Sequence, residues 1–151
     1  NLGEADAIVT QCVGLPIAVA TADCIPILLE APEAVGVVHA GWRGAAAGVV
    51  IETLATMARL GHPATRAAIG PAIGPCCFEV GAEVAERFPG FVATTTWGTA
   101  SVDLPGYVAG QLKGLQVWRS EDCTFTSDTL HSWRNDKTKQ RQVAVAWLPT
   151  S

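Results

Sequence analysis

Cys24 and His39 are the residues of this sequence best suited to chemistry, because an adjacent thiol and imidazole can share a metal ion or act as nucleophile and base. The runs 24–30 and Ala34–His39, joined by a short Ala31-Pro32-Glu33 turn, predict a β-hairpin. Symmetric pairing about that turn places Cys24 opposite His39, with Cβ atoms about 4.5–5.5 Å apart. A cysteine packed as a small hydrophobe and a histidine at the rim of the core are the alternative interpretation.

The turn that follows His39 predicts an anion site. Gly41-Trp42-Arg43-Gly44 leads directly into an Ala-rich segment with helical periodicity. Free N–H groups at a helix start, glycines that permit close approach and the Arg43 guanidinium are together typical of phosphate binding. The alternative is an ordinary glycine-rich turn with a solvated arginine.

Apolar, β-branched runs alternate with Ala-rich stretches along the whole chain, which indicates an α/β or α+β fold. No linker, repeat or low-complexity tract interrupts it, so we expect one domain over residues 1–151. The expected strands are Ala7–Thr10, Ile17–Ala22, Ile25–Glu30, Ala34–His39, Ala67–Gly70, Gln116–Arg119 and Gln142–Trp147. The expected helices are Gly44–Leu60, Gly81–Arg87 and Pro105–Leu115.

Composition excludes several classes of protein. With 49% hydrophobic and 16% charged residues, the chain can bury a core, which argues against disorder. The net charge of −4 and the absence of Lys/Arg runs argue against nucleic acid as a partner, and no apolar run is long enough to span a membrane. The acidic start is unlike a signal peptide. Five cysteines without a CxxC pair predict reduced thiols in the cytoplasm, and we interpret Cys76 and Cys77 as packing residues.

Several motifs together resemble one family, the laccase-domain family. Its members are also called multicopper polyphenol oxidoreductases or peptidoglycan editing factors, and their better-supported activity is purine nucleoside phosphorolysis. The resemblance covers essentially the whole chain in order, and its most specific element is the string His-Ala-Gly-Trp-Arg-Gly. The motifs are Thr21–Leu28, Val38–Gly44, Gly70–Gly81, Asp103-Leu104, Asp122–Thr124 and Asp128–Arg134.

The resemblance implies an α+β fold, a mixed β-sandwich flanked by helices in α/β/β/α layers. It also implies cleavage of adenosine and inosine by phosphate to base and ribose 1-phosphate, with adenosine deamination as a further activity. The family's zinc is held by His, Cys and His, of which the last two match Cys24 and His39. Its first histidine precedes the Ala-Asp-Ala stretch near which this sequence begins, so we expect an N-terminally truncated domain. His131 is then the best internal candidate for the third ligand, followed by His62, and a partner subunit is a further source.

We assign candidate roles on this basis. Arg43 and Gly44 are expected to bind phosphate, and Glu79 and Arg134 to contribute to substrate binding. Asp23 and Glu79 are candidates for acid–base or ligand-supporting groups, with structural hydrogen bonding as the alternative. The expected partners are purine nucleosides and phosphate, acting on a monomer or homodimer.

Three other functions stay open. A copper-dependent polyphenol oxidase fits poorly, because a multicopper site consumes many histidines and this sequence has three, with no His-x-His pair. A Cys24–His39 hydrolase or amidase that edits peptidoglycan precursors is the second. The third is a non-enzymatic fragment whose exposed sheet edge pairs with another chain.

Overall fold

The computed structural model describes residues 5–150, which form nine strands, five helices and three sheets. The strands are β1 (Ala7–Thr10), β2 (Ile17–Thr21), β3 (Ile25–Ala31), β4 (Ala34–Ala40), β5 (Arg66–Ile69), β6 (Val92–Thr94), β7 (Ala100–Val102), β8 (Gln116–Arg119) and β9 (Gln142–Ala146). The helices are α1 (Trp42–Ala46), α2 (Val49–Arg59), α3 (Ala82–Ala85), α4 (Leu104–Gln111) and α5 (Trp133–Asp136).

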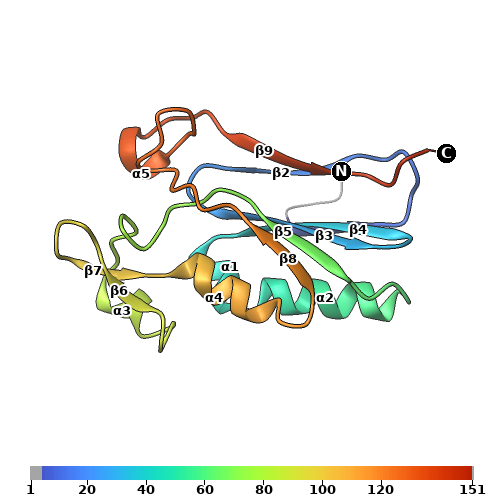
Figure 1. Cartoon of the computed structure of the whole chain (residues 1–151), viewed down its shortest axis with the longest axis horizontal. Helices are drawn as coiled ribbons and strands as arrows, with labels where there is room; N and C mark the ends of the chain where they lie inside the picture. The colour runs from blue at the N-terminus through green and yellow to red at the C-terminus, as the bar shows by residue number, and fades with distance from the viewer. Residues whose placement is uncertain (1–4, 151) are drawn as a thin grey trace.

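Two sheets lie face to face, with helices against the larger one (Figure 1). The larger sheet has the order β1-β4-β3-β5-β8, and its strands are antiparallel except for the parallel pair β5–β8. The antiparallel pair β2–β9 covers one face, whereas α2 and α4 lie on the opposite side (Figure 1). The expected α+β class and mixed sandwich are therefore confirmed.

The central hairpin shows the expected strands in a different register. Ala31 pairs with Ala34 and Pro26 with His39, so the turn consists of Pro32 and Glu33 alone. The expected pairing of Cys24 with His39 was wrong, because Ala31 extends β3 and shortens the turn by one residue. Cys24 therefore lies diagonally from His39 and on the same face of the sheet.

Strand alternation creates two separate cores. Ile25, Ile27 and Leu29 of β3 point toward the helices and join the main core, which includes Met57 and Phe88. Alternate residues of the same sheet, such as Val37, pack between the two sheets with Ile17 and Leu148. Because side chains repeat every second residue in a strand, His39 lies on the same face as Val37, facing the β2–β9 pair.

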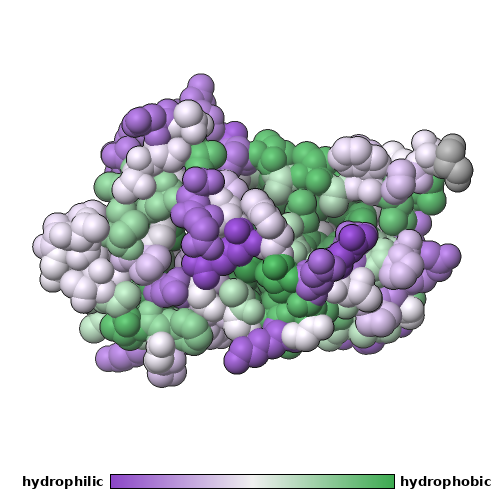
Figure 2. All heavy atoms as spheres, in the orientation of Figure 1, coloured by the Kyte–Doolittle hydropathy of each residue, from purple (hydrophilic) through white to green (hydrophobic). Residues whose placement is uncertain are grey.

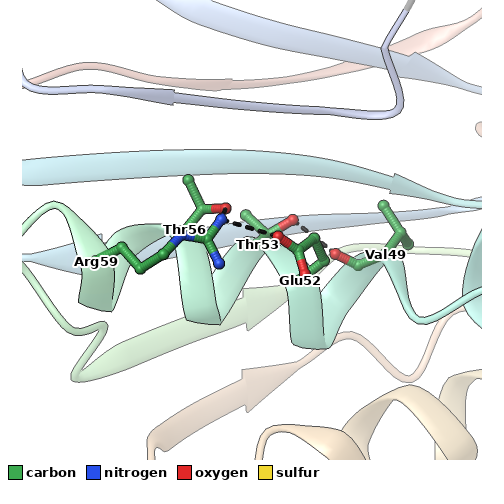
Figure 3. Close-up of polar contacts among 5 residues, drawn as sticks. All are labelled: Val49, Glu52, Thr53, Thr56 and Arg59. Atoms are coloured by element: carbon green, nitrogen blue, oxygen red, sulfur yellow. Dashed lines mark hydrogen bonds and ion pairs between the residues drawn. The ribbon is translucent and has the colours of Figure 1, made fainter.

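The expected helix Gly44–Leu60 is two helices. Gly48 has φ of +84°, a left-handed conformation that ends α1 and begins α2. On α2 the Thr53 hydroxyl donates to the Val49 carbonyl (2.7 Å), and the Arg59 guanidinium reaches the Glu52 carboxylate (2.9 Å) and the Thr56 hydroxyl (Figure 3). The Glu52–Arg59 pair is solvent-exposed and contributes little to stability.

Apolar side chains remain uncovered at the open edges of the two sheets. A hollow of about 800 Å³ between β8 and β9 is lined by Leu28, Ala68, Trp118, Val145 and Trp147. Figure 2 shows hydrophobic residues gathered in the gap between the upper and lower layers. None of the described helices is long and apolar enough to cross a membrane.

The break at Gly48 gives a first prediction. A Cβ at Gly48 would meet no atom within 4 Å, so the Gly48→Ala change costs only backbone strain, about 1 kcal/mol of unfolding free energy. Gly110 lies in α4 without a positive φ, so the matched control Gly110→Ala should instead add about 0.5–1 kcal/mol. Urea denaturation measures both, and equal effects would contradict the assigned left-handed conformation.

Candidate functional site

Five of the residues expected to do chemistry, Asp23, Cys24, His39, Arg43 and Arg134, line one hollow of about 580 Å³ at the end of the gap between the sheets. The β2–β3 connection, the end of β4, the start of α1 and the region of α5 meet there. The hollow is lined by residues 20–24, His39, Gly41, Trp42, Arg43, Ile73, Phe78, Leu104, Trp133, Arg134 and Arg141.

Cys24 and His39 meet over the backbone of Gly41. A Cβ placed on Gly41 would lie 3.1 Å from the Cys24 sulfur and 4.0 Å from Cε1 of His39. Both side chains therefore occupy the space that any larger residue at position 41 would need. The diagonal relationship across β3 and β4 brings thiol and imidazole together despite the changed register.

Asp6 holds the other side of the imidazole. Its carboxylate lies 2.9 Å from Nδ1 of His39, and its carbonyl accepts the His39 backbone N–H at 2.7 Å. The Cys24 side chain raises the pKa of His39 to about 9, burial opposes the rise, and Asp6 adds to it. In metal-free protein the imidazole is therefore protonated at neutral pH. A carboxylate on the second ring nitrogen is also what orients a metal-binding histidine.

The second prediction concerns the titration of His39 in chelator-treated protein. Folding raises its pKa from 6.5 to about 9, so its contribution to stability is fully present below pH 6.5 and is lost as pH rises through 9. The Asp6→Asn variant should titrate at lower pH than the wild type, because the neutral amide stabilises the imidazolium less.

NMR titration of the imidazole signals measures both values. Asp128→Asn, at an exposed position, is the control and should leave the His39 pKa unchanged. A wild-type pKa near 6.5 would contradict the described contacts.

Asp23, next to Cys24, is a buried structural centre. Its side chain accepts hydrogen bonds from the hydroxyls of Thr124 (2.7 Å) and Ser132 (2.6 Å) and from the backbone N–H of Arg134 (2.7 Å). Its backbone has φ of +88°, and its carbonyl accepts the N–H of Ile73 at 3.0 Å. The carboxylate thus fastens α5 to the β2–β3 connection, which favours a positioning role over acid–base chemistry.

The third prediction is that Asp23→Ala lowers the free energy of unfolding by about 3 kcal/mol or more. The change removes a buried hydrogen-bond acceptor and leaves three donors without it. Urea denaturation of the variant and of the exposed control Asp128→Ala, which should change little, measures the effect. If the Ala variant does not fold, Asp23→Asn keeps the size and should show an intermediate loss. A stability equal to the wild type would contradict this role.

Three guanidinium groups surround the hollow. Arg134 donates to the Glu79 carbonyl at 2.8 Å and lies over the Phe78 ring, and Arg43 lies over the Trp42 ring at 4.4 Å. Arg141 is the third, held by the carbonyls of residues 138 and 140. Sequence reasoning named the first two and missed Arg141, whose only signal is its place just before β9.

Glu79 and Gly44 lie outside the lining of this hollow. The Glu79 carboxylate accepts from the Trp97 indole (2.7 Å) and the Thr99 hydroxyl (2.8 Å), and these bonds lower its pKa. Gly44 faces Asp6 and the His39 carbonyl from a neighbouring hollow. Helix α1, whose N-cap is Gly41, has only five residues, so the arginines are the main source of positive charge.

Comparison with known proteins shows the family of this chain. A family model described as multi-copper polyphenol oxidoreductase laccase matches residues 1–149. The chain belongs to this laccase family. A purine nucleoside phosphorylase of Streptomyces griseus is 44% identical, covering 95% of this chain and 63% of the relative, and one of Aquifex aeolicus is 39% identical, covering 93% and 69%. The chain thus spans about two thirds of the length of these relatives.

Solved structures are similar as well. The hypothetical protein YfiH of Bacillus licheniformis superposes with a TM-score of 0.85 at 28% identity, covering 95% of this chain and 61% of that one. YlmD of Geobacillus stearothermophilus also gives 0.85, at 30% identity, with 96% and 61% covered.

The other two histidines of this laccase-family chain lie elsewhere. The backbone of His131 is bonded to the side chain of Gln142, and the His62 imidazole lies 3.7 Å from Glu33. Neither lines the hollow of Cys24 and His39. Among the described residues no third His, Cys, Asp or Glu joins that pair at metal-binding distance.

This family member also carries a thiol cluster that the sequence did not reveal. Cys77 packs in the core, as expected, but the sulfurs of Cys76, Cys77 and Cys123 all lie within 4.8 Å of one another, where they could hold a metal ion. Burial raises the pKa of Cys76 and raises that of Cys77 to about 12. Burial acts to raise the pKa of Cys123. Hydrogen bonds from backbone N–H groups such as that of Gly74 outweigh this effect, so the pKa is lowered.

Proposed function

We propose that this chain is the core of a purine nucleoside phosphorylase that cleaves adenosine or inosine with phosphate. The convergence of three guanidinium groups on the hollow of Cys24 and His39 carries the proposal. Relatives that bear this name are 37–44% identical over most of the chain, which adds support. The products would be the free base and ribose 1-phosphate.

Arg43, Arg134 and Arg141 would hold the phosphate dianion. Guanidinium groups bind phosphate oxygens in bidentate fashion and keep their charge at any physiological pH. In the reaction a phosphate oxygen bonds to C1′ of the ribose, while the C1′–N9 bond breaks and its electron pair goes to the purine. Fixed positive charge beside the hollow would bring the anion to the sugar and offset its desolvation.

Aromatic side chains would receive the purine. Trp42, Phe78 and Trp133 line the same hollow, and their faces suit stacking against a flat base. Arg43 and Arg134 already lie over two of these rings, so base and phosphate would bind side by side. The rings would also exclude water, which favours phosphorolysis over hydrolysis.

Cys24 and His39 fit two of the ligands of a zinc ion. The donor set of thiol and imidazole, with Asp6 on the second ring nitrogen, matches zinc chemistry. A catalytic zinc normally has three protein ligands, so the third would come from outside the described residues. When bound, the ion would act as a Lewis acid, and with adenosine the same site would support deamination. The five free thiols suit a reducing compartment, the cytoplasm.

The fourth prediction tests the phosphate site. Arg43→Gln and Arg141→Gln should each raise the KM for phosphate by about 10–100-fold in zinc-loaded protein, since each removes a charged hydrogen-bond donor. The assay follows ribose 1-phosphate and free base from inosine, with ammonia release from adenosine as a parallel reading. Arg59→Gln, on the far surface of α2, is the matched control and should leave KM unchanged. An unchanged KM for phosphate in both arginine variants would overturn the proposed phosphate site, and normal phosphorolysis by Cys24→Ala protein would overturn the role given to Cys24.

A second candidate, a cysteine hydrolase or amidase, is favoured by one observation. Cys24, His39 and Asp6 form a thiol–imidazole–carboxylate series in which the carboxylate orients the base. Alkylation of metal-free protein, followed by peptide mass analysis, separates the two. Fast, stoichiometric modification of Cys24 with chelator-insensitive hydrolysis would favour the hydrolase, whereas phosphorolysis restored by zinc would favour the phosphorylase.

A further inference from the structure

The thiols of Cys76, Cys77 and Cys123 form a compact group apart from the hollow of Cys24 and His39. The Cys76 sulfur lies 3.2 Å from that of Cys77 and 3.6 Å from that of Cys123, and all three sulfurs lie within 4.8 Å of one another. Sulfurs bonded to one zinc ion at about 2.3 Å stand roughly 3.8 Å apart in a tetrahedral arrangement. Two of the observed separations are shorter than that value by 0.6 Å or less, and the third does not exceed 4.8 Å, so small side-chain movements would complete the site.

Backbone structure holds the three residues in place. The N–H groups of Cys77 and Phe78 both donate to the Gly74 carbonyl at 3.0 Å, and this tight turn brings two consecutive cysteines together. Cys123 forms a β-bridge with Ala72, and the Gly74 N–H donates to its sulfur at 3.2 Å. The site is therefore built by two segments that are far apart in sequence.

An entry path and a compensating charge accompany the thiols. Cys76 and Cys123 line a hollow of about 240 Å³ that Arg119 also lines, whereas Cys77 is 3% exposed. Three thiolates around one zinc or copper(I) ion carry net negative charge. The Nε of Arg119 is buried and has no hydrogen-bond partner within the described residues, so a positive group is available beside the complex.

We propose that Cys76, Cys77 and Cys123 bind one thiophilic d10 metal ion, zinc or copper(I), at a site separate from the proposed active site. Binding replaces up to three thiol protons by the metal, and these protons are released to solvent. Ile73 and Phe78, on either side of the Gly74–Cys77 turn, line the hollow of Cys24 and His39. Metal binding would therefore restrict the motion of the Gly74–Cys77 turn, and with it the motion of the two side chains that line the hollow.

The experiment, the fifth prediction, uses the full chain with Cys24→Ala and His39→Ala, which removes the other metal-binding pair. Reduced, metal-free protein is titrated with Zn²⁺ and separately with Cu⁺ against a chromophoric chelator. We expect one equivalent of at least one ion to bind tightly and to raise the Tm. Adding Cys123→Ser should weaken binding on the order of 100-fold, whereas adding Cys12→Ser, at an exposed single cysteine, should change nothing.

X-ray absorption on the loaded parent variant makes the test independent of whether Cys123→Ser folds. Three sulfur neighbours at about 2.3 Å support the proposal with either metal. Binding of neither ion, fewer than three sulfur ligands, or a Cys76–Cys123 disulfide formed in preference to metal uptake would overturn it. The test variant lacks Cys24 and His39, so none of these outcomes bears on the phosphorylase proposal.

Discussion

The buried carboxylate of Asp23 is the interaction on which the arrangement of the site depends. The chain passes from the smaller sheet to the larger one at this residue, between the end of β2 at Thr21 and the start of β3 at Ile25. A left-handed backbone at a non-glycine residue is costly and persists where surrounding contacts enforce it. The donors from residues 124, 132 and 134 provide that enforcement, and through them α5 and Arg134 are placed opposite Cys24.

Ser132 shows how closely this junction is assembled. Its hydroxyl donates to Asp23 and accepts the N–H of Asn135, so one oxygen both caps α5 and docks it. A four-residue helix has little stability of its own, because most of its backbone groups lie at its ends. The hydrogen bonds to Asp23 therefore set the position of α5, and with it the position of Arg134.

The sequence was most informative where structure is local. Alternation and turn residues predicted β1, β3, β4 and β8 nearly to the residue, and the hairpin that carries Cys24 and His39 with them. The register was wrong because Ala31 suits both a strand and a turn, and only pairing with Ala34 decides between them. Gly48 divides the expected helix Gly44–Leu60, and the sequence did not predict this break because composition does not reveal the sign of φ.

Features that depend on distant contacts were not predictable in this way. Cys76 and Cys123 are 47 positions apart in the sequence. They come together because Ala72 and Cys123 form an isolated β-bridge, and no sequence pattern predicts such a bridge. The short strands β6 and β7 and the helix α5 likewise lack a periodic run long enough to recognise. Arg141 could not be assigned to the site because its position depends on the pairing of the adjacent strand β9 with the distant strand β2.

The apolar strip between β8 and β9 has a consequence for how the molecule behaves in solution. Both strands are sheet edges, and Trp118 of β8 and Trp147, which directly follows β9, are exposed. Exposed edges of this kind associate with other chains unless charged side chains or a covering segment prevent it. Here Arg66 and Glu30 are the nearby charges, paired with each other and thus less effective as a barrier. These exposed edges and tryptophans therefore favour self-association as the protein concentration rises.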